Sequence, residues 1–344
     1  MVIKKLKRGS VLLLLVFLLL ACDQPGSTKQ YPLDYSDAIM GTSFTIKVSS
    51  LPGSLKIDEL KLRIKDQLDK LNGQMSTYQQ DSELSLLNKN QSTQWIAVSA
   101  ELYSVLKEAN NIADLSQGAF DITVGPLVNL WGFGPDQMSF EAPSDKLIQQ
   151  QLTKIGYHHL LFDDNKQQVR KEIADLYLDL SAIAKGYAVD QVGLLLEKHG
   201  IADYMVEIGG ELRLKGNNIA NQPWRIAVEK PTADKRMIQK VLPLSDISLA
   251  TSGDYRNFFE QDGVRFSHTI DPRSGMPITH KLASITILSD TTMKADALAT
   301  ALMVLGPEQG FKMAEEEKIA ALFIIKKDDM FVEKATSSFI NRLR

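Results

Sequence analysis

The stretch that decides the fold begins with RFSHTIDPRSGMPI at residues 265–278 and ends with MKADALATALMVL at residues 293–305. A short apolar strand over residues 284–288 separates the Gly/Pro-rich polar turn from the apolar helix. The rest of the chain also mixes strands and helices, without the regular alternation that builds a parallel sheet. We therefore expect an α+β fold, with mixed or antiparallel sheets flanked by helices.

Hydrophobic periodicity predicts the individual elements. Strands are expected over residues 42–48, 176–179, 204–208 and 211–215. Helices are expected over residues 55–71, 99–115, 144–155, 184–199 and 293–305. Asn72-Gly73 is expected to end the first of these helices, and Ser99 to cap the second.

Asp296 and Thr300 stand four residues apart among apolar or small neighbours, so a helix projects both side chains from one face. A hydrogen-bonded surface pair is the ordinary alternative. A buried carboxylate, however, needs a partner or a cation. Two hard oxygen donors suit Mg²⁺, which keeps coordination positions for water and phosphate oxygens. The pair therefore predicts a metal-assisted site for a phosphorylated ligand.

Two further segments have the features of an anion or nucleotide site. Residues 179–187, DLSAIAKGY, end an expected strand and open a helix, where free N–H groups and Lys185 favour a phosphate. Plain capping by Asp179 or Ser181, with a solvated lysine, remains open. Gly209-Gly210 is either a hairpin turn or a place where a planar ligand or pyrophosphate approaches the backbone. A P-loop and a Gly-x-Gly-x-x-Gly motif after a strand are both absent from the sequence.

His268 lies in the polar turn between Ser267 and Asp271. A lone histidine is usually structural, and a general base is the functional alternative here. Asp121, in the segment GAFD, is similarly either a helix N-cap or a ligand-binding residue.

The N-terminus predicts a lipoprotein signal. A basic segment precedes an apolar run over residues 11–20, which is too short for the roughly 20 residues that span a bilayer. The run ends Leu-Leu-Ala-Cys22, which resembles the bacterial lipobox, and Asp23 resembles the signal for retention in the inner membrane. We expect a signal peptide over residues 1–21, acylation of Cys22, a tether over residues 22–34 and a single domain over residues 35–344. An ordinary signal peptide with an incidental cysteine is the alternative.

The cysteine count and the net charge exclude some classes of function. Cys22 is the single cysteine, so its acylation leaves no thiol for disulfides or nucleophilic catalysis. Of 39 Lys and Arg, four lie in the signal, which leaves 35 against 42 Asp and Glu and a net charge of −7. A net acidic chain without a basic run outside its signal excludes nucleic acid as an expected partner.

Eight blocks of sequence occur in the order seen in the ApbE family, the FAD:protein FMN transferases, and the chain resembles that family from about residue 35 to 335. The blocks are Met40-Gly-Thr, Met75-Ser-Thr-Tyr78, Gly118-Ala-Phe-Asp121, Asp179 to Tyr187, Glu207-Ile-Gly-Gly210, Thr251 to Tyr255, Ser267 to Gly275 and Ala295 to Thr300.

The resemblance implies two intertwined subdomains related to the T-fold, FAD as substrate and Mg²⁺ as cofactor. It implies FAD binding by Met40, Tyr78, Ala119, Phe120, Asp121, Asp179, Lys185 and Ile270. It implies metal binding by Asp296, Thr300 and the main-chain carbonyl of Ala182. The chain has Ala299 where some relatives carry a second acid, and so offers one carboxylate fewer.

The implied reaction is phosphoryl transfer: a threonine hydroxyl of an acceptor protein attacks the FMN-side phosphorus of FAD, and AMP leaves. His268 is the expected base, and Asp271 is the second choice for the base or for orienting His268. The implied acceptors are flavin-carrying subunits of membrane redox complexes, such as sodium-pumping NADH:quinone reductase, on the periplasmic side of the inner membrane. An FAD pyrophosphatase and a non-catalytic flavin-binding lipoprotein are the alternatives.

Overall fold

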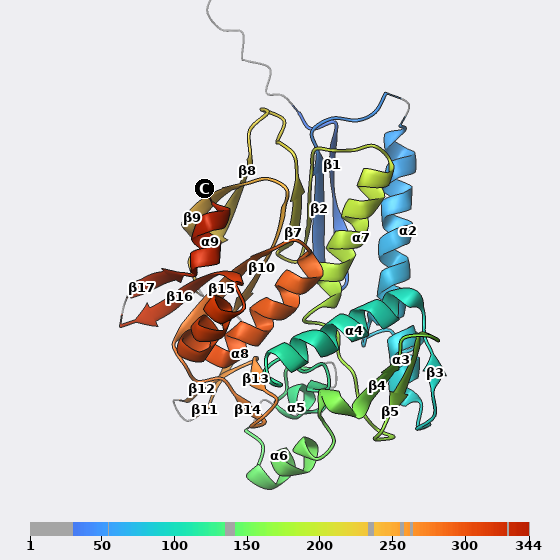
Figure 1. Cartoon of the computed structure of the whole chain (residues 1–344), viewed down its shortest axis with the longest axis vertical. Helices are drawn as coiled ribbons and strands as arrows, with labels where there is room; N and C mark the ends of the chain where they lie inside the picture. Colours follow the sequence, from blue (N-terminus) through green and yellow to red (C-terminus); the bar gives the residue numbers. More distant parts are fainter. Residues whose placement is uncertain are drawn as a thin grey trace, which may run out of the picture.

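An eight-stranded, entirely antiparallel sheet forms the centre of the protein (Figure 1). The computed structural model describes residues 30–53, 55–134, 142–232, 237–254, 258–261, 264–328 and 330–343. In spatial order the strands are β1 (Leu33–Ile39), β2 (Thr42–Val48), β6 (Tyr204–Ile208), β7 (Glu211–Lys215), β10 (Ile247–Gly253), β15 (Leu282–Ser289), β16 (Ala320–Lys327) and β17 (Met330–Ala335). The predicted α+β class, with helices and antiparallel sheets, is confirmed.

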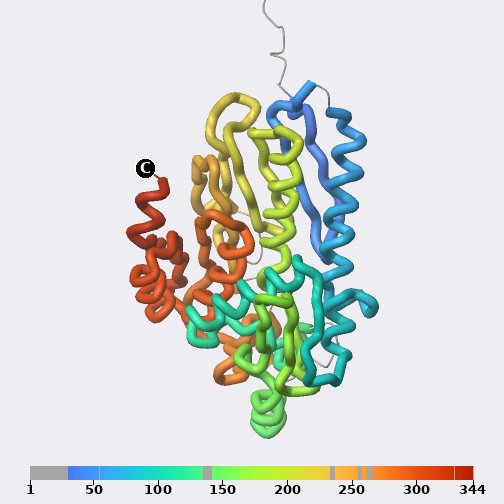
Figure 2. The backbone as a smooth tube through the Cα atoms, turned by 45° about the vertical axis from the view of Figure 1, so that its right-hand side comes forward, coloured from blue at the N-terminus to red at the C-terminus, as the bar shows by residue number. Residues whose placement is uncertain are grey.

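Three long helices cover one face of this sheet: α2 (Ile57–Met75), α7 (Ala184–Lys198) and α8 (Thr292–Glu316). α2 and α7 run side by side, with α2 on β1 and α7 on β6 and β7, and α8 packs on β10 and β15 (Figures 1 and 2). Their apolar stripes and the inward strand residues form the main core, which includes Ile46, Ile64, Val189, Ile285 and Leu302. Burial of these stripes is the main source of stability for the helices.

A hairpin of β8 (Trp224–Glu229) and β9 (Ile238–Leu244), together with α9 (Ser337–Arg342), covers the opposite face. Its core contains Trp224, Leu242 and Phe339 packed on Leu249 and Leu322 of the sheet. The middle of the sheet is therefore buried on both faces, which explains why β15 is buried at almost every position and why β16 begins with a continuous apolar run.

Two long excursions from the sheet lie together at one end of the molecule (Figure 1). The first, between α2 and α7, contains α3 (Glu83–Lys89), β3 (Ile96–Ala97), α4 (Ala100–Leu115), α5 (Gly125–Leu130), α6 (Asp145–Leu152), η1 (Tyr157–His159), β4 (Leu160–Asp163) and β5 (Gln168–Lys171). The second, between β10 and β15, contains β11 (Phe258–Gln261), β12 (Val264–Ser267), β13 (Ile270–Asp271) and β14 (Met276–Pro277). A third apolar cluster, including Leu127, Trp131, Ile148 and Ile270, joins the two excursions.

The structure corrects several expected boundaries. α2 continues through Asn72-Gly73 to Met75, because Leu71 and Met75 are buried on the same face of the helix. Residues 176–179 are irregular rather than a strand, although Leu176 and Leu178 are buried. The α8 segment extends to Glu316 across a kink at Gly306, whose φ of 77° is non-helical.

The expected tether over residues 22–34 overlaps the folded domain. β1 begins at Leu33, which is 1% exposed and pairs with Val48, and Asp34 pairs with Lys47. The domain therefore starts two residues before the predicted boundary at residue 35. Cys22 and the signal peptide lie outside the described residues. Among the residues that the structure does describe, we find no helix with the length and apolarity needed to cross a membrane.

Glu197, near the end of α7, lies in a polar network that predicts an acid-sensitive contribution to stability. Burial raises the pKa of Glu197, but bonds from Lys215, Tyr204 and Arg213 outweigh it and lower the pKa to about 2. A folded pKa below the unfolded value of 4.5 stabilises the protein above that pH, and the contribution is lost as pH falls toward 2. Between pH 6 and pH 3.5, we expect urea unfolding to show wild type losing about 1 kcal/mol more than Glu197→Gln. Parallel stability curves for the two proteins would contradict this assignment.

Candidate functional site

A pocket of about 620 Å³ opens where the β1–β2 turn, the end of α2 and the start of α7 meet. This volume lies within the usual range for small-molecule sites. Four of the residues expected to bind FAD line it: Met40, Tyr78, Asp179 and Lys185. Tyr78 is 73% exposed, so its ring is available to a ligand at the mouth. The pocket thus brings together predicted residues from three distant parts of the sequence.

Two tight hairpin turns form one side of this region. Met40 and Gly41 join β1 to β2 with positive φ, and Gly209 and Gly210 do the same between β6 and β7. A Cβ on Gly209 would lie 3.0 Å from Thr42 and 3.2 Å from the Lys185 side chain. The Gly-Gly segment is therefore a hairpin turn, and its missing side chain also lets the turn approach Lys185.

Lys185 occupies the centre of a charged cluster rather than a solvated surface position. Its Nζ donates to the Ser181 carbonyl at 2.9 Å and lies 3.7 Å from Glu211 and 4.0 Å from Asp296. The side chains of Glu211 and Asp296 are only 7% and 6% exposed. Plain capping of α7 by Asp179 or Ser181 is not observed, because Ile183 is the N-cap residue and Asp179 accepts from the Ser181 N–H.

The electrostatics of this cluster show a shortage of positive charge. Burial raises the pKa of Glu211, and the nearby Asp296 raises it further against the attraction of Lys185. Burial also raises the pKa of Asp296, opposed by Lys185 and by the Gly186 N–H. Burial alone would lower the pKa of Lys185, but the two carboxylates outweigh it and raise it. Two buried acids share one lysine, and Glu211 Oε2 is buried without a hydrogen-bond partner.

Asp296 and Thr300 lie on α8 as expected, one turn apart. Asp296 Oδ2 accepts the Gly186 N–H at 3.0 Å, which places the carboxylate on the first turn of α7. Thr300 is half-buried and its hydroxyl lies 3.4 Å from the Ser252 hydroxyl of β10. Ala182 immediately precedes the N-cap residue of α7, where the backbone is not yet helical.

The residues present fit a hard divalent cation. Asp296, Thr300 and the Ala182 carbonyl supply oxygen donors only, the chemistry that Mg²⁺ prefers. The excess of buried carboxylate over lysine is the structural observation that favours a cation here. In the described part of the chain, no three His, Cys, Asp or Glu side chains form a metal-binding group. The side chains alone are therefore too few for a complete coordination sphere, as is usual for Mg²⁺ that binds water and substrate phosphates.

The GAFD segment is connected to the pocket lining through its neighbour Ile122. Ala119 and Phe120, which were expected to bind FAD, are buried at 1% and 2% exposure and do not line the pocket. Both carboxylate oxygens of Asp121 are used, accepting from the backbone and hydroxyl of Thr123 and from the Tyr157 N–H. The Asp179 N–H donates to the Ile122 carbonyl at 2.7 Å, which ties the segment to the pocket lining.

His268 lies in the second excursion, between β12 and β13. Its ring lies in a T-shaped arrangement with the Phe133 ring, with 6.3 Å between centroids, and the preceding Ser267 hydroxyl accepts the Thr269 N–H. Asp271 binds Arg273 through both carboxylate oxygens, at 2.9 and 2.8 Å. Both Asp271 oxygens are therefore engaged by Arg273, which favours His268 over Asp271 as the base.

The loop of His268 approaches the GAFD segment. A Cβ on Gly118 would lie 3.8 Å from the Arg273 side chain, and the Trp131 indole N–H donates to the Gly275 carbonyl at 2.9 Å. Ile270, expected to bind FAD, is 5% exposed and packs in the cluster that joins the two excursions. The roles of the predicted binding, metal and catalytic residues remain predictions.

Glu211 is part of the charged cluster around Lys185 but was not predicted from the sequence. Glu211 directly follows the Gly-Gly turn, and that position was the available signal. Its proximity to Lys185 depends on the packing of β7 against the start of α7, which no local pattern in the sequence indicates.

Sequence relatives and solved structures similar to this chain belong to the same family. The ApbE family profile matches residues 40–323. A protein of Vibrio cholerae named FAD:protein FMN transferase is 47% identical over 94% of this chain and 95% of its own length. A protein of the same name from Haemophilus influenzae is 42% identical over 98% of this chain and 97% of its own.

Solved structures that resemble the protein come from the same family as its sequence relatives. The flavin transferase ApbE from Vibrio cholerae superposes with a TM-score of 0.84 over 90% of this chain and 98% of its own, at 47% identity. The apo form of the Pseudomonas stutzeri flavinyl transferase ApbE gives a TM-score of 0.83 at 38% identity, over 90% and 96%. The matched region contains the pocket and the cluster around Lys185, and the chain therefore belongs to the ApbE family.

Proposed function

We propose that this protein transfers the FMN moiety of FAD to a threonine hydroxyl of an acceptor protein and releases AMP. The observation that carries the proposal is the cluster of Lys185, Glu211 and Asp296 beside a pocket large enough for part of a dinucleotide. The names of the Vibrio cholerae and Haemophilus influenzae relatives support the same activity.

Phosphoryl transfer requires accurate positioning and neutralisation of charge more than covalent help from the enzyme. Asp296, Thr300 and the Ala182 carbonyl would hold Mg²⁺, which would neutralise negative charge on the pyrophosphate oxygens. Lys185 is placed to bind a phosphate oxygen as a point charge. Met40, Tyr78 and Asp179 line the pocket in which we place the flavin half of FAD.

His268 would take the proton from the incoming threonine hydroxyl. The hydroxyl oxygen then forms a bond to the FMN-side phosphorus, and the bond from that phosphorus to the AMP phosphate oxygen breaks. Water in place of threonine would give free FMN and AMP, the pyrophosphatase alternative. A protein that only binds flavin would not need a base or a metal beside the pyrophosphate.

One experiment distinguishes these activities. The protein is incubated with FAD, Mg²⁺ and a threonine-containing acceptor subunit of a membrane redox complex, such as sodium-pumping NADH:quinone reductase. We expect in-gel flavin fluorescence on the acceptor and a mass increase equal to one FMN ester. Release of free FMN without labelling of the acceptor would favour the pyrophosphatase, and unchanged FAD would favour the binding protein.

We further propose that the protein is an inner-membrane lipoprotein facing the periplasm, where it would meet such acceptors. The support is the lipobox-like sequence that ends at Cys22. Cys22→Ala is expected to prevent acylation, so that the protein stays an unprocessed precursor or loses its lipid anchor. Metabolic labelling with a palmitate analogue measures this, and label that persists in Cys22→Ala would refute it.

A further inference from the structure

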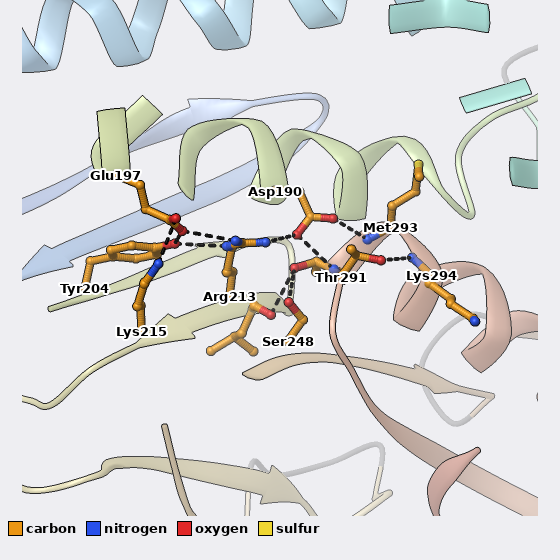
Figure 3. A network of polar contacts seen from close by, with 11 residues as sticks. Asp190, Glu197, Tyr204, Arg213, Lys215, Ser248, Thr291, Met293 and Lys294 are labelled. Carbon is orange, nitrogen blue, oxygen red and sulfur yellow. Dashed lines mark hydrogen bonds and ion pairs between the residues drawn. The ribbon is translucent and has the colours of Figure 1, made fainter. Parts of the chain in front are cut away.

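The first turns of α7 and α8 are each bound by an aspartate of the other helix. Asp296 of α8 accepts the N–H of Gly186 in the first turn of α7, at 3.0 Å. Asp190 of α7 accepts the N–H groups of Thr292 and Met293 in the first turn of α8, both at 2.9 Å (Figure 3). Each helix therefore supplies the carboxylate that satisfies free N–H groups of the other.

The spacing makes this a two-point contact. Asp190 is one turn after Gly186 on α7, and Asp296 is one turn after Thr292 on α8. The helices approach so closely that a Cβ on Gly186 would lie 2.5 Å from the Thr292 carbonyl and 2.8 Å from Asp296 Cβ. Any shift of α8 along α7 would therefore break both contacts together.

Asp190 is itself fixed by a charged network (Figure 3). It is 6% exposed, and its Oδ1 also accepts from Arg213 Nη1 at 3.0 Å. Arg213 donates further to the Tyr204 hydroxyl and to Glu197 at 3.0 Å. Glu197 is the second carboxylate on Arg213, and its hydrogen bonds and ion pairs in the described part of the chain go to Tyr204, Arg213 and Lys215 rather than to α8.

We propose that Asp190 is a positioning residue: it holds the first turn of α8 against α7 and so places Asp296 and Thr300 beside Lys185. The inference rests on the proposed function for its effect on catalysis. Its physical basis is the geometry of the acceptors. In Asp190→Asn one oxygen becomes an NH₂ group, which meets a backbone N–H or the guanidinium as donor against donor.

The test compares Asp190→Asn with Glu197→Gln, an isosteric change that also removes one carboxylate from Arg213. Thermal unfolding measures stability, and titration of Mg²⁺ into protein with FAD, followed by flavin fluorescence, measures metal affinity. FMN transfer gives kcat and KM. We expect both variants to lose stability. Asp190→Asn alone is expected to lose roughly tenfold or more in Mg²⁺ affinity and in kcat, the scale for supporting residues of a metal site.

Equal effects of the two variants on Mg²⁺ affinity and kcat at similar unfolding temperatures would overturn the proposal, because Asp190 would then only stabilise the fold. If Asp190→Asn does not fold, Asp190→Glu replaces it. That variant keeps the charge on Arg213 but moves the acceptor atoms by one methylene, and the same loss relative to Glu197→Gln is expected. Wild type that shifts flavin fluorescence with Mg²⁺ but transfers no FMN would reject the proposed function while the affinity comparison still tests Asp190.

Discussion

Replacement of Asp296 by alanine should lower kcat for FMN transfer by about 10²–10³-fold or more, the scale for removing a group that stabilises transition-state charge. The variant removes the carboxylate that we expect to bind Mg²⁺ and also the acceptor of the Gly186 N–H. Thr300→Val, which removes only a neutral oxygen, should have a smaller effect in the same direction. Transfer is measured by in-gel fluorescence of the acceptor over a range of Mg²⁺ concentrations.

Glu308→Ala is the matched control, because Glu308 is an exposed acid on the same helical segment. Its activity should equal that of wild type. EDTA should inactivate wild type, and added Mg²⁺ should restore it. Full activity of Asp296→Ala in the presence of EDTA would remove the metal from the proposed site.

The sequence predicted those parts of the fold whose cause is local. The side chain of Ser99 caps α4 as expected, because N-cap preference depends on the residue and its nearest neighbours. The strand over residues 42–48 matches β2 because strict alternation has one structural solution when one face is buried.

Predictions failed where distant packing decides the outcome. Asn72 and Gly73 are poor helix residues, but burial of Met75 extends α2 past them. Residues 176–179 have the apolar pattern of a strand but no neighbouring strand to pair with in the described sheets.

The same distinction applies to the candidate site. The placement of Asp296 and Thr300 one turn apart on α8 could be predicted, because local periodicity defines it. Glu211 and Asp190 could not, since their roles depend on how β7 and α8 approach α7. From the sequence alone, Asp190 in the middle of a helix looks like a surface residue; its burial and its bonds to α8 and to Arg213 show otherwise.

The second large effect is expected for His268→Asn, which should transfer FMN about 10²-fold or more slowly than wild type while binding FAD normally. A base acts on the incoming hydroxyl and does not hold the dinucleotide, so the loss should fall on kcat.

Lys185→Ala should behave differently from His268→Asn. Loss of its charge should weaken FAD binding, and part of its rate loss should recover at high FAD concentration. Quenching of flavin fluorescence measures affinity, and gel fluorescence measures transfer.

His199→Asn is the control for His268→Asn, since His199 lies at the far end of α7 and its ring contacts the Leu195 carbonyl. It should leave both affinity and transfer unchanged. Loss of FAD binding in His268→Asn would make that histidine a ligand contact rather than a base. Undiminished transfer would exclude it from the mechanism and leave Asp271, which is paired with Arg273, as the remaining candidate.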